Sequence, residues 1–190
     1  MRNELRRSKL VDLPYDFANW YQNMVPAAQA IHAANPNVLI YFSGLNFSEA
    51  LAPIPAGLPL TSSLPGNSQD SFIFNPNSFS FSNKIVLELH IYTMSDRIST
   101  SNCTLMSDAL YQNGFNAMSE PGKDKAVKYH FPVVMSEWGI AQDTESLGLV
   151  YTQCLAAFLE KWKAGWMNWS IAGSQILRSG THDSDDTWVS

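Results

Sequence analysis

Residues 132–139 read Pro-Val-Val-Met-Ser-Glu-Trp-Gly, an apolar run that ends in a carboxylate. Three more apolar runs cover residues 38–42, 85–92 and 166–171. Runs of this length without polar alternation are typical of strands that are covered on both faces. The sequence therefore predicts four buried strands, and the one at 132–137 carries an acidic group at its C-terminal end.

Helical patterns lie between these runs. Apolar residues recur at helical spacing over residues 20–34, 108–118 and 147–163, and Asn35-Pro36 stops the first pattern. The third pattern predicts a cap near Asp143 or Thr144. Because strands alternate with helices, we expect βα units and a parallel sheet. The Pro-rich stretch from Glu49 to Asn83 breaks the rhythm and predicts a long functional or mobile loop.

Composition indicates one globular domain over residues 1–190, with 45% hydrophobic and 15% charged residues. The net charge of -5, without a basic stripe, argues against a nucleic-acid partner. No run approaches the roughly 20 apolar residues of a membrane span. The histidines His32, His130 and His182 have no metal-ligand spacing, and no phosphate loop is present. We expect neither a metal nor a cofactor.

Side chains that could take part in catalysis lie at the expected C-terminal ends of several strands. In a parallel α/β barrel, such ends supply the reactive groups together. Hydrolysis of a glycosidic bond requires two carboxylates that face each other across the bond. An exposed terminal glutamate or a buried core histidine would each be a plainer explanation of one member taken alone. The ordered set is more specific, and comprises Asn3, Glu4, His90, Tyr92, Glu137 and Trp169.

In this order, Asn-Glu, His-x-Tyr, Ser-Glu-Trp-Gly and a late Trp resemble glycoside hydrolase family 5, the cellulase family. The longer phrases at 1–6, 33–37 and 172–174 resemble its fungal and plant cellulase-like branch. The resemblance implies an α/β fold, a partial (β/α)8 TIM barrel covering roughly the fourth to eighth strands. It also implies a retaining endo-β-1,4-glucanase that acts on a polysaccharide or oligosaccharide.

The resemblance implies a role for each site residue. Glu4 would be the general acid/base and Glu137 the nucleophile. Asn3 would hydrogen-bond the sugar 2-hydroxyl, and Trp169 would form a floor for the sugar ring. Tyr92 would hold Glu137 in position, with His90 hydrogen-bonding nearby.

The chain also departs from the family pattern. Leu5 follows Asn3-Glu4 where many members carry Pro, and Trp138 replaces a commoner Phe. The first three strands, and an early Arg that supports the nucleophile, are not in the sequence. We therefore expect the activity of the chain alone to be impaired. Two alternatives remain open, a non-catalytic carbohydrate-binding or inactive half-barrel and a β-mannanase-type specificity. Open sheet edges would also permit self-association.

Two cysteines, Cys103 and Cys154, fit one disulfide, although two unrelated buried thiols would also account for them. Asn102-Cys103-Thr104 and Asn46-Phe47-Ser48 are glycosylation sequons, as secreted proteins carry. The paired cysteines, the sequons and the family resemblance predict an extracellular protein. The chain itself contains no signal peptide pattern.

Overall fold

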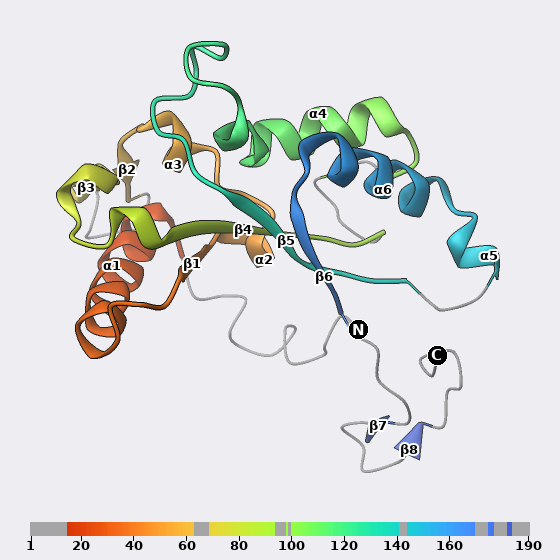
Figure 1. Ribbon diagram of the computed structural model, residues 1–190, viewed down its shortest axis with the longest axis horizontal. Coiled ribbons are helices and arrows are strands. Elements are labelled where there is room, and N and C mark those ends of the chain that lie inside the picture. The colour runs from red at the N-terminus through yellow and green to blue at the C-terminus, as the bar shows by residue number, and fades with distance from the viewer. Residues whose placement is uncertain are drawn as a thin grey trace.

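The computed structural model describes residues 15–62, 69–93, 98, 100–140 and 144–169, together with two short strands at 175–176 and 182–183. Asn3 and Glu4 lie outside the described residues. A parallel sheet in the order β1-β4-β5-β6 forms the centre of the described part (Figure 1). Its strands are β1 (Ile40–Ser43), β4 (Ile85–Ile91), β5 (Val133–Trp138) and β6 (Gly165–Asn168). Their spatial order follows the chain, as it does around a barrel.

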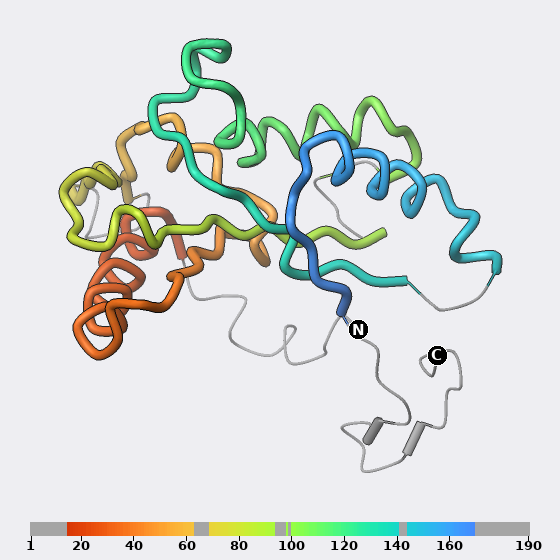
Figure 2. Tube along the Cα trace, in the orientation of Figure 1, coloured from red at the N-terminus to blue at the C-terminus, as the bar shows by residue number. Residues whose placement is uncertain are grey.

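The three long helices of the described residues lie against one face of the sheet. They are α1 (Phe17–Ala34), α4 (Cys103–Asn113) and α6 (Val150–Trp162), the last preceded by the single turn α5 (Thr144–Leu147). Figure 2 shows α4 and α6 running side by side above β4, β5 and β6, with α1 beside β1. A sheet with helices on one side only is what one sector of a (β/α)8 barrel looks like.

Alternate residues of β1, β4 and β5 point to the helices and are buried. Ile40 and Phe42 of β1 pair in register with Ile85 and Leu87 of β4, and all four are less than 5% exposed. Leu89 and Met135 continue this apolar layer toward the C-terminal ends. The other face carries Glu88 and His90 on β4, and both are only half-buried. The polar groups therefore lie on the face turned away from the helices.

Helix α1 begins three residues earlier than its apolar pattern predicts. The Asp16 side chain accepts a hydrogen bond from the Asn19 backbone N–H at 3.0 Å, which caps the first turn. Trp20 packs on Phe42, and its indole N–H donates to the Ser43 carbonyl at 2.6 Å. The cap and the buried Trp20 side chain together fix α1 against β1.

The other two helical predictions need correction at their boundaries. α4 begins at Cys103, because Asn102 caps it, and it stops at Gly114, where φ is +153°. α6 begins at Val150, and its N-cap is Leu149, which makes no side-chain capping bond. The predicted cap near Asp143 or Thr144 is therefore wrong for this helix: Thr144 starts the separate turn α5, and Asp143 lies outside the described residues.

The segment from Glu49 to Asn83 is not a plain loop where the structure describes it. It contains short elements, and it contributes Ile54, Leu60 and Phe74 to the core at 1% exposure or less. Phe74 meets both Trp20 and Phe42 at ring distances below 6 Å. Aromatic packing explains why the described parts of this Pro-rich segment join the core although they show no helix or strand period. Its short elements are α3 (Pro53–Ala56), β2 (Leu60–Thr61), β3 (Ser71–Phe72), η2 (Pro76–Ser78) and η3 (Ser82–Lys84).

Three further features complete the description. The turn α2 (Leu45–Ser48) follows β1 directly, and η4 (Phe115–Met118) follows α4. Near the C-terminus, β7 (Gln175–Ile176) and β8 (His182–Asp183) form an antiparallel pair. The predicted strand at 166–171 is described as β6 only, because residues 170 and 171 lie outside the described part.

Candidate active site

Four of the six predicted site residues lie at the C-terminal ends of neighbouring strands. His90 lies on β4 and Tyr92 directly after it. Glu137 lies near the end of β5, and Trp169 directly follows β6. The other two, Asn3 and Glu4, lie outside the described residues, so no geometry is assigned to them. One edge of the sheet therefore gathers an imidazole, a phenol, a carboxylate and an indole.

An irregularity in β5 sets the direction of Glu137. Leu89 pairs with Met135, but the next residue of β4, His90, pairs with Glu137, so Ser136 is an extra residue. Such a β-bulge re-aims the side chains that follow it. Without the extra residue, Glu137 would pair with Ile91, which is fully buried on the helix face. The bulge instead brings Glu137 opposite His90, on the face that is free of helices.

Both carboxylate oxygens of Glu137 lie against side chains from β4 and its end. The Tyr92 hydroxyl donates to Oε1 at 2.7 Å, and Nδ1 of His90 lies 3.1 Å from Oε2. The side chains of His90 and Glu137 are 22% and 31% exposed, so a ligand can still reach them. One hydrogen bond and one close imidazole contact restrict the orientation of the carboxylate, as a positioned nucleophile needs.

Tyr92 is a permanent hydrogen-bond donor in this arrangement. Burial, and after it the hydrogen bond and negative charge of Glu137, raises the pKa of Tyr92 far above its ordinary value of 10.0. The phenol therefore keeps its proton wherever the protein is folded near neutral pH, and Glu137 keeps the bond. Deprotonation would place two negative charges 2.7 Å apart in a half-buried site.

Tyr151 supports the end of β4 from the helix side. This α6 residue is 2% exposed, and its hydroxyl donates to the Ile91 carbonyl at 2.9 Å. Burial raises the pKa of Tyr151, although a backbone hydrogen bond from Gly139 acts in the opposite direction. Tyr151 therefore links α6 to Ile91, which precedes Tyr92, and to Gly139, which lies two residues after Glu137.

Gly139 allows β5 and the chain after β6 to come close together. The Trp169 backbone N–H donates to the Trp138 carbonyl at 2.7 Å. A Cβ on residue 139 would collide with the Trp169 carbonyl oxygen. The Trp169 side chain itself is 60% exposed. Close backbone contact therefore places an open indole one strand away from Glu137.

Sequence reasoning missed Glu88, a carboxylate one layer below His90. Ser43 Oγ donates to Glu88 Oε1, and Ser48 Oγ donates to the Glu88 carbonyl oxygen at 2.7 Å. Ser48 also accepts from the Gly44 backbone N–H at 3.0 Å. The signal in the sequence is a single acidic residue inside the apolar run 85–92. This network ties the end of β1 to β4, directly beneath the candidate site.

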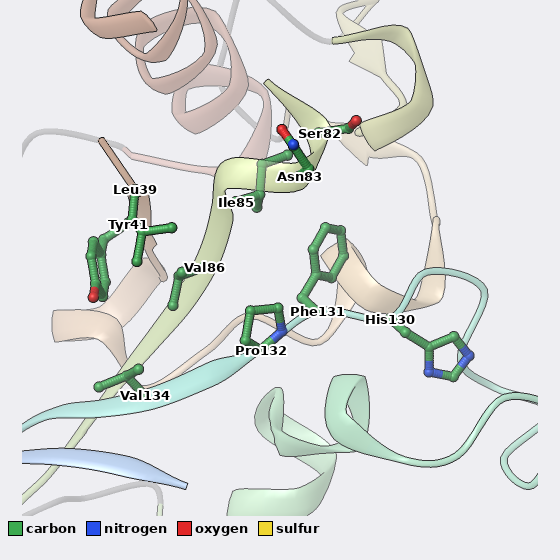
Figure 3. Close-up of a pocket in the computed structure, with 10 residues that line it drawn as sticks. All are labelled: Leu39, Tyr41, Ser82, Asn83, Ile85, Val86, His130, Phe131, Pro132 and Val134. Carbon is green, nitrogen blue, oxygen red and sulfur yellow. The ribbon is translucent and has the colours of Figure 1, made fainter. Parts of the chain in front are cut away.

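A separate cavity of about 340 Å³ lies at the opposite end of the sheet (Figure 3). Tyr41, Val86 and Val134 line it from the N-terminal halves of three strands, with His130 at its margin. In (β/α)8 barrels the N-terminal ends of the strands serve stability, whereas chemistry occurs at the C-terminal ends. This cavity is therefore not part of the candidate active site. No metal-binding cluster is found in the described part of the chain.

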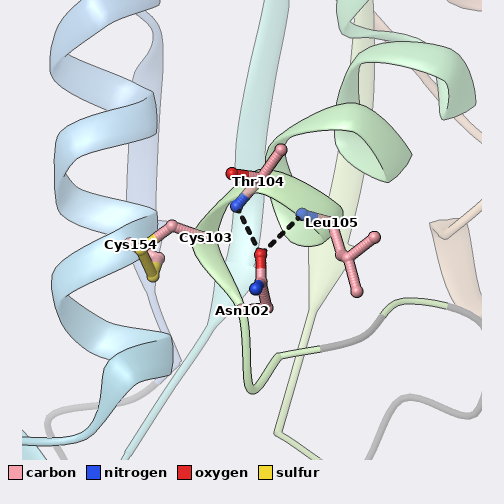
Figure 4. The surroundings of a disulfide bond; sticks show 5 residues. All are labelled: Asn102, Cys103, Thr104, Leu105 and Cys154. Atoms are coloured by element: carbon pink, nitrogen blue, oxygen red, sulfur yellow. Dashed lines mark hydrogen bonds between the residues drawn. A yellow bond between two sulfur atoms is a disulfide. The ribbon is translucent and has the colours of Figure 1, made fainter.

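The two cysteines form a disulfide between the first residue of α4 and α6 (Figure 4). The Cα atoms of Cys103 and Cys154 are 5.0 Å apart. The neighbouring Asn102 accepts from the backbone N–H groups of Thr104 and Leu105 at 2.9 and 3.1 Å. The same short stretch thus caps α4 and fastens it to α6, the two helices that cover the site strands.

Parallel strands with helices on one face and an acidic group at their C-terminal edge define a sector of a (β/α)8 barrel enzyme. A sequence model of the cellulase family (glycosyl hydrolase family 5) matches residues 2–175. The chain therefore belongs to glycosyl hydrolase family 5.

Individual relatives agree with this family and with the fold. The chain is 30% identical over 185 residues to a glycosyl hydrolase 5 family protein from Chamaecyparis obtusa. It is also similar to a beta-glucanase from Saccharophagus degradans, with TM-scores of 0.50 for the native form and 0.52 for the complex with cellotetraose. The identities to these two structures, 14% and 12%, support the fold alone.

The matches cover most of this chain but a smaller part of each relative. They cover 94% of this chain and 28% of the Chamaecyparis protein. For the two structures they cover 82% and 92% of this chain, against 39% and 46% of theirs. The chain thus has the α/β fold of part of a family 5 barrel, as the sequence predicts. No helix in the described residues is long and apolar enough to cross a bilayer.

Proposed function

We propose that the chain is the nucleophile-bearing part of a retaining glycoside hydrolase that cleaves β-1,4-glucan internally. The observation that carries the proposal is the placement of Glu137, whose carboxylate accepts from Tyr92 on one oxygen and lies 3.1 Å from His90 Nδ1 on the other. The carboxylate is restricted in orientation at the C-terminal edge of a parallel sheet. Membership of glycosyl hydrolase family 5 supports the same reaction class.

In this mechanism Glu137 attacks the anomeric carbon while Glu4 protonates the leaving glycosidic oxygen. The bond to the leaving sugar breaks as the bond to the Glu137 carboxylate forms. Water, deprotonated by Glu4, then attacks the same carbon and releases Glu137 with overall retention of configuration. The two carboxyl groups must stand about 5 to 5.5 Å apart for this sequence of steps.

The remaining site residues take supporting roles in the proposal. Tyr92 and His90 orient Glu137 for attack on the anomeric carbon. Asn3 donates to the sugar 2-hydroxyl, a contact that strengthens in the transition state. The indole of Trp169, which is 60% exposed, offers an apolar floor for the sugar ring at the point of cleavage.

A β-1,4-glucan is the substrate we favour. The similar beta-glucanase from Saccharophagus degradans is seen in complex with cellotetraose. A β-mannan is the alternative, because related barrels differ in specificity mainly through their loops. Comparing turnover of carboxymethylcellulose and of galactomannan separates the two.

The direct test replaces Glu137 with Gln in the longest form of the protein that carries these residues. The variant is expected to lose at least a thousandfold in kcat, because an amide cannot form the glycosyl-enzyme. Glu160→Gln is the matched control, since Glu160 is exposed on α6 and should leave the rate unchanged. Equal rates for Glu137→Gln and the unchanged protein would refute the proposal.

A second candidate is a carbohydrate-binding but inactive half-barrel. The sheet face turned away from the helices is only half-buried at Val134 and Glu88. This exposure favours an inactive half-barrel for the 190 residues alone. We expect little hydrolysis from the purified chain, and self-association through its open sheet edges. Fast turnover by a monomer, checked by sedimentation at micromolar concentration, would contradict both expectations.

An extracellular location completes the proposal. The disulfide between Cys103 and Cys154 persists best in an oxidising compartment. The Asn102 sequon lies on an exposed helix start, where a glycan could be attached. Fractionation of the producing cells tests this location, and a wholly reduced intracellular protein would contradict it.

A further inference from the structure

The sequon that begins at Asn102 lies at the start of α4 and stays at the surface. Asn102, Cys103 and Thr104 are all exposed, and the backbone of Asn102 is extended. An N-linked glycan is attached to the Asn side chain of the pattern Asn-x-Ser/Thr and must project into solvent. The acceptor amide and the hydroxyl that completes the pattern therefore both meet this requirement in the folded protein.

The oxygen and the nitrogen of the Asn102 side-chain amide are used differently. Oδ1 accepts from the Thr104 and Leu105 backbone N–H groups, and Figure 4 shows Nδ2 on the far side of the amide from both bonds. Within the described part of the chain, no hydrogen bond occupies Nδ2. A glycan on Nδ2 replaces one amide hydrogen and leaves Oδ1 as an acceptor. Glycosylation is therefore compatible with the capping of α4.

The contact between Asn102 and Thr104 also favours the chemistry of attachment. A side-chain oxygen that accepts from the backbone N–H two residues later forms an Asx-turn, which is local and needs no tertiary packing. When Nδ2 loses a proton, negative charge moves onto Oδ1, where the two backbone N–H groups stabilise it. The hydrogen bonds that cap the helix therefore also make Nδ2 a better nucleophile.

The sequon at Asn46 lacks these features. Its Ser48 is 2% exposed, and the Ser48 hydroxyl donates to the Glu88 carbonyl and accepts from the Gly44 backbone N–H. Asn46 is half-buried, its φ is +54°, and among the described residues its side chain accepts no hydrogen bond from the Ser48 N–H. The hydroxyl of this pattern is therefore enclosed by the fold, and the Asx-turn is not formed.

We propose that Asn102 is an N-glycosylation site whose Nδ2 carries the glycan while Oδ1 continues to cap α4, and that Asn46 stays unmodified. Nδ2 attacks the anomeric carbon of an oligosaccharide that is linked to a polyprenyl diphosphate. The C–N bond forms as the bond from that carbon to the diphosphate oxygen breaks. The lipid diphosphate leaves, and the proton of Nδ2 passes to a base of the transferase. The proposal rests on the proposed extracellular location, because this glycan is added on the secretory route.

The test produces the full chain behind a secretion signal in cultured eukaryotic cells. The mass of the protein is measured before and after a peptide N-glycosidase, in the cell-associated and the secreted fractions, so that occupancy is measured even where folding is inefficient. The unchanged protein is expected to lose a glycan, and peptide mass spectrometry should locate it at Asn102. Asn102→Asp should carry none at this position, although Asp also caps helices.

Three further variants separate the sequon from the cap. Thr104→Val removes the hydroxyl of the pattern and should abolish the glycan, whereas Thr104→Ser keeps the pattern and should retain it. Neither change touches Oδ1 of Asn102. Asn46→Asp is the matched control, because it removes the other sequon by the same substitution, and it should leave the glycan content unchanged.

Thermal unfolding tests whether the glycan and the cap coexist. Asn102→Ala removes both the acceptor and the cap, so it should unfold at a lower temperature than Asn102→Asp. The glycosylated protein should unfold no earlier than Asn102→Asp, because Oδ1 still accepts from Thr104 and Leu105. A glycosylated protein that unfolds at the midpoint of Asn102→Ala would mean that the glycan displaces the cap, and would overturn the proposal.

The remaining outcomes keep the site apart from the location. An unmodified Asn102 in both fractions of the secreting cells would refute the site, whatever the location of the natural protein. A glycan on Asn46 would refute the distinction between the two sequons. A protein that is modified at Asn102 in these cells, but stays intracellular in its natural ones, would support the site and contradict only the extracellular location.

Discussion

The carboxylate of Glu137 accepts from a phenol on one oxygen and faces an imidazole on the other, and the phenol is the shorter contact. Tyr92 reaches Oε1 at 2.7 Å, and its raised pKa keeps the donor proton in place across the neutral range. Loss of this hydroxyl would free one oxygen of the carboxylate to rotate. The Tyr92 hydroxyl is therefore expected to contribute most to the orientation of Glu137.

Tyr92→Phe tests this dependence. We expect kcat to fall roughly ten- to a hundredfold with a smaller change in KM, because a misplaced nucleophile affects the chemical step most. Steady-state kinetics on soluble glucan gives both constants. Tyr111→Phe is the matched control, since Tyr111 also donates to a carboxylate, Asp124, at 2.6 Å but lies on α4. An equal loss in both variants would contradict a specific role of Tyr92.

Tyr151→Phe tests the support of β4 from the helix side. The variant leaves the buried Ile91 carbonyl without its donor, so the free energy of unfolding should fall by about 1 to 2 kcal/mol at pH 7. The raised pKa of Tyr151 gives this loss a pH dependence. Its contribution is fully present below the unfolded value of about 10, and it is lost as the pH rises from there toward the folded value.

Urea unfolding of both proteins from pH 7 to pH 11 checks the sign. The difference between the unchanged protein and Tyr151→Phe should shrink as the pH passes 10. A difference that grows in the alkaline range would mean that the folded state lowers the pKa of Tyr151, contrary to its burial.

At the scale of elements, the four strands are predictable from sequence because each is a short, nearly continuous apolar run. The helix starts are less predictable, because caps decide them: Asp16 starts α1 and Asn102 starts α4. The bulge at Ser136 leaves no mark in an apolar pattern, since only the pairing with β4 reveals it. The same holds for the described parts of the 49–83 segment, which pack against α1.

The candidate site was predictable only in part for similar reasons. His90, Tyr92 and Glu137 form a pattern along the chain, and the structure brings their side chains together. Glu88 is one acidic letter in an apolar run, and its link to Ser43 is visible only once the two strands pair. The positive φ of Phe47 and Ser48 has no sequence signature, because neither residue type favours this conformation.

The disulfide joins two helices, and its removal tests how firmly they cover the site. The bond closes a loop of 51 residues, for which the chain-entropy model predicts about 4 kcal/mol of stabilisation as an upper value. We expect the double variant Cys103→Ala with Cys154→Ala to lose about 2 to 4 kcal/mol in urea unfolding. The same loss should appear when the unchanged protein is reduced, and no loss in either case would contradict a structural role.

At the scale of the whole molecule, the described sheet is one sector of a barrel. Its helices cover one face, and its reactive side chains gather at the C-terminal edge of the other. The matched region is 39% and 46% of the two solved beta-glucanase structures. The activity of a complete barrel thus requires side chains beyond the described strands, whereas Glu137, which we propose as the nucleophile, and its neighbours Tyr92 and His90 are present in this sector.

Covalent trapping tests whether Glu137 is the nucleophile of a retaining mechanism. The longest form of the protein is treated with a fluorinated cellobiosyl fluoride, which forms the glycosyl-enzyme quickly and releases it slowly. The protein is expected to gain one covalently bound disaccharide, and peptide mass spectrometry should locate it on Glu137. Turnover without an adduct, an adduct on another carboxylate, or a product of inverted configuration would contradict the account.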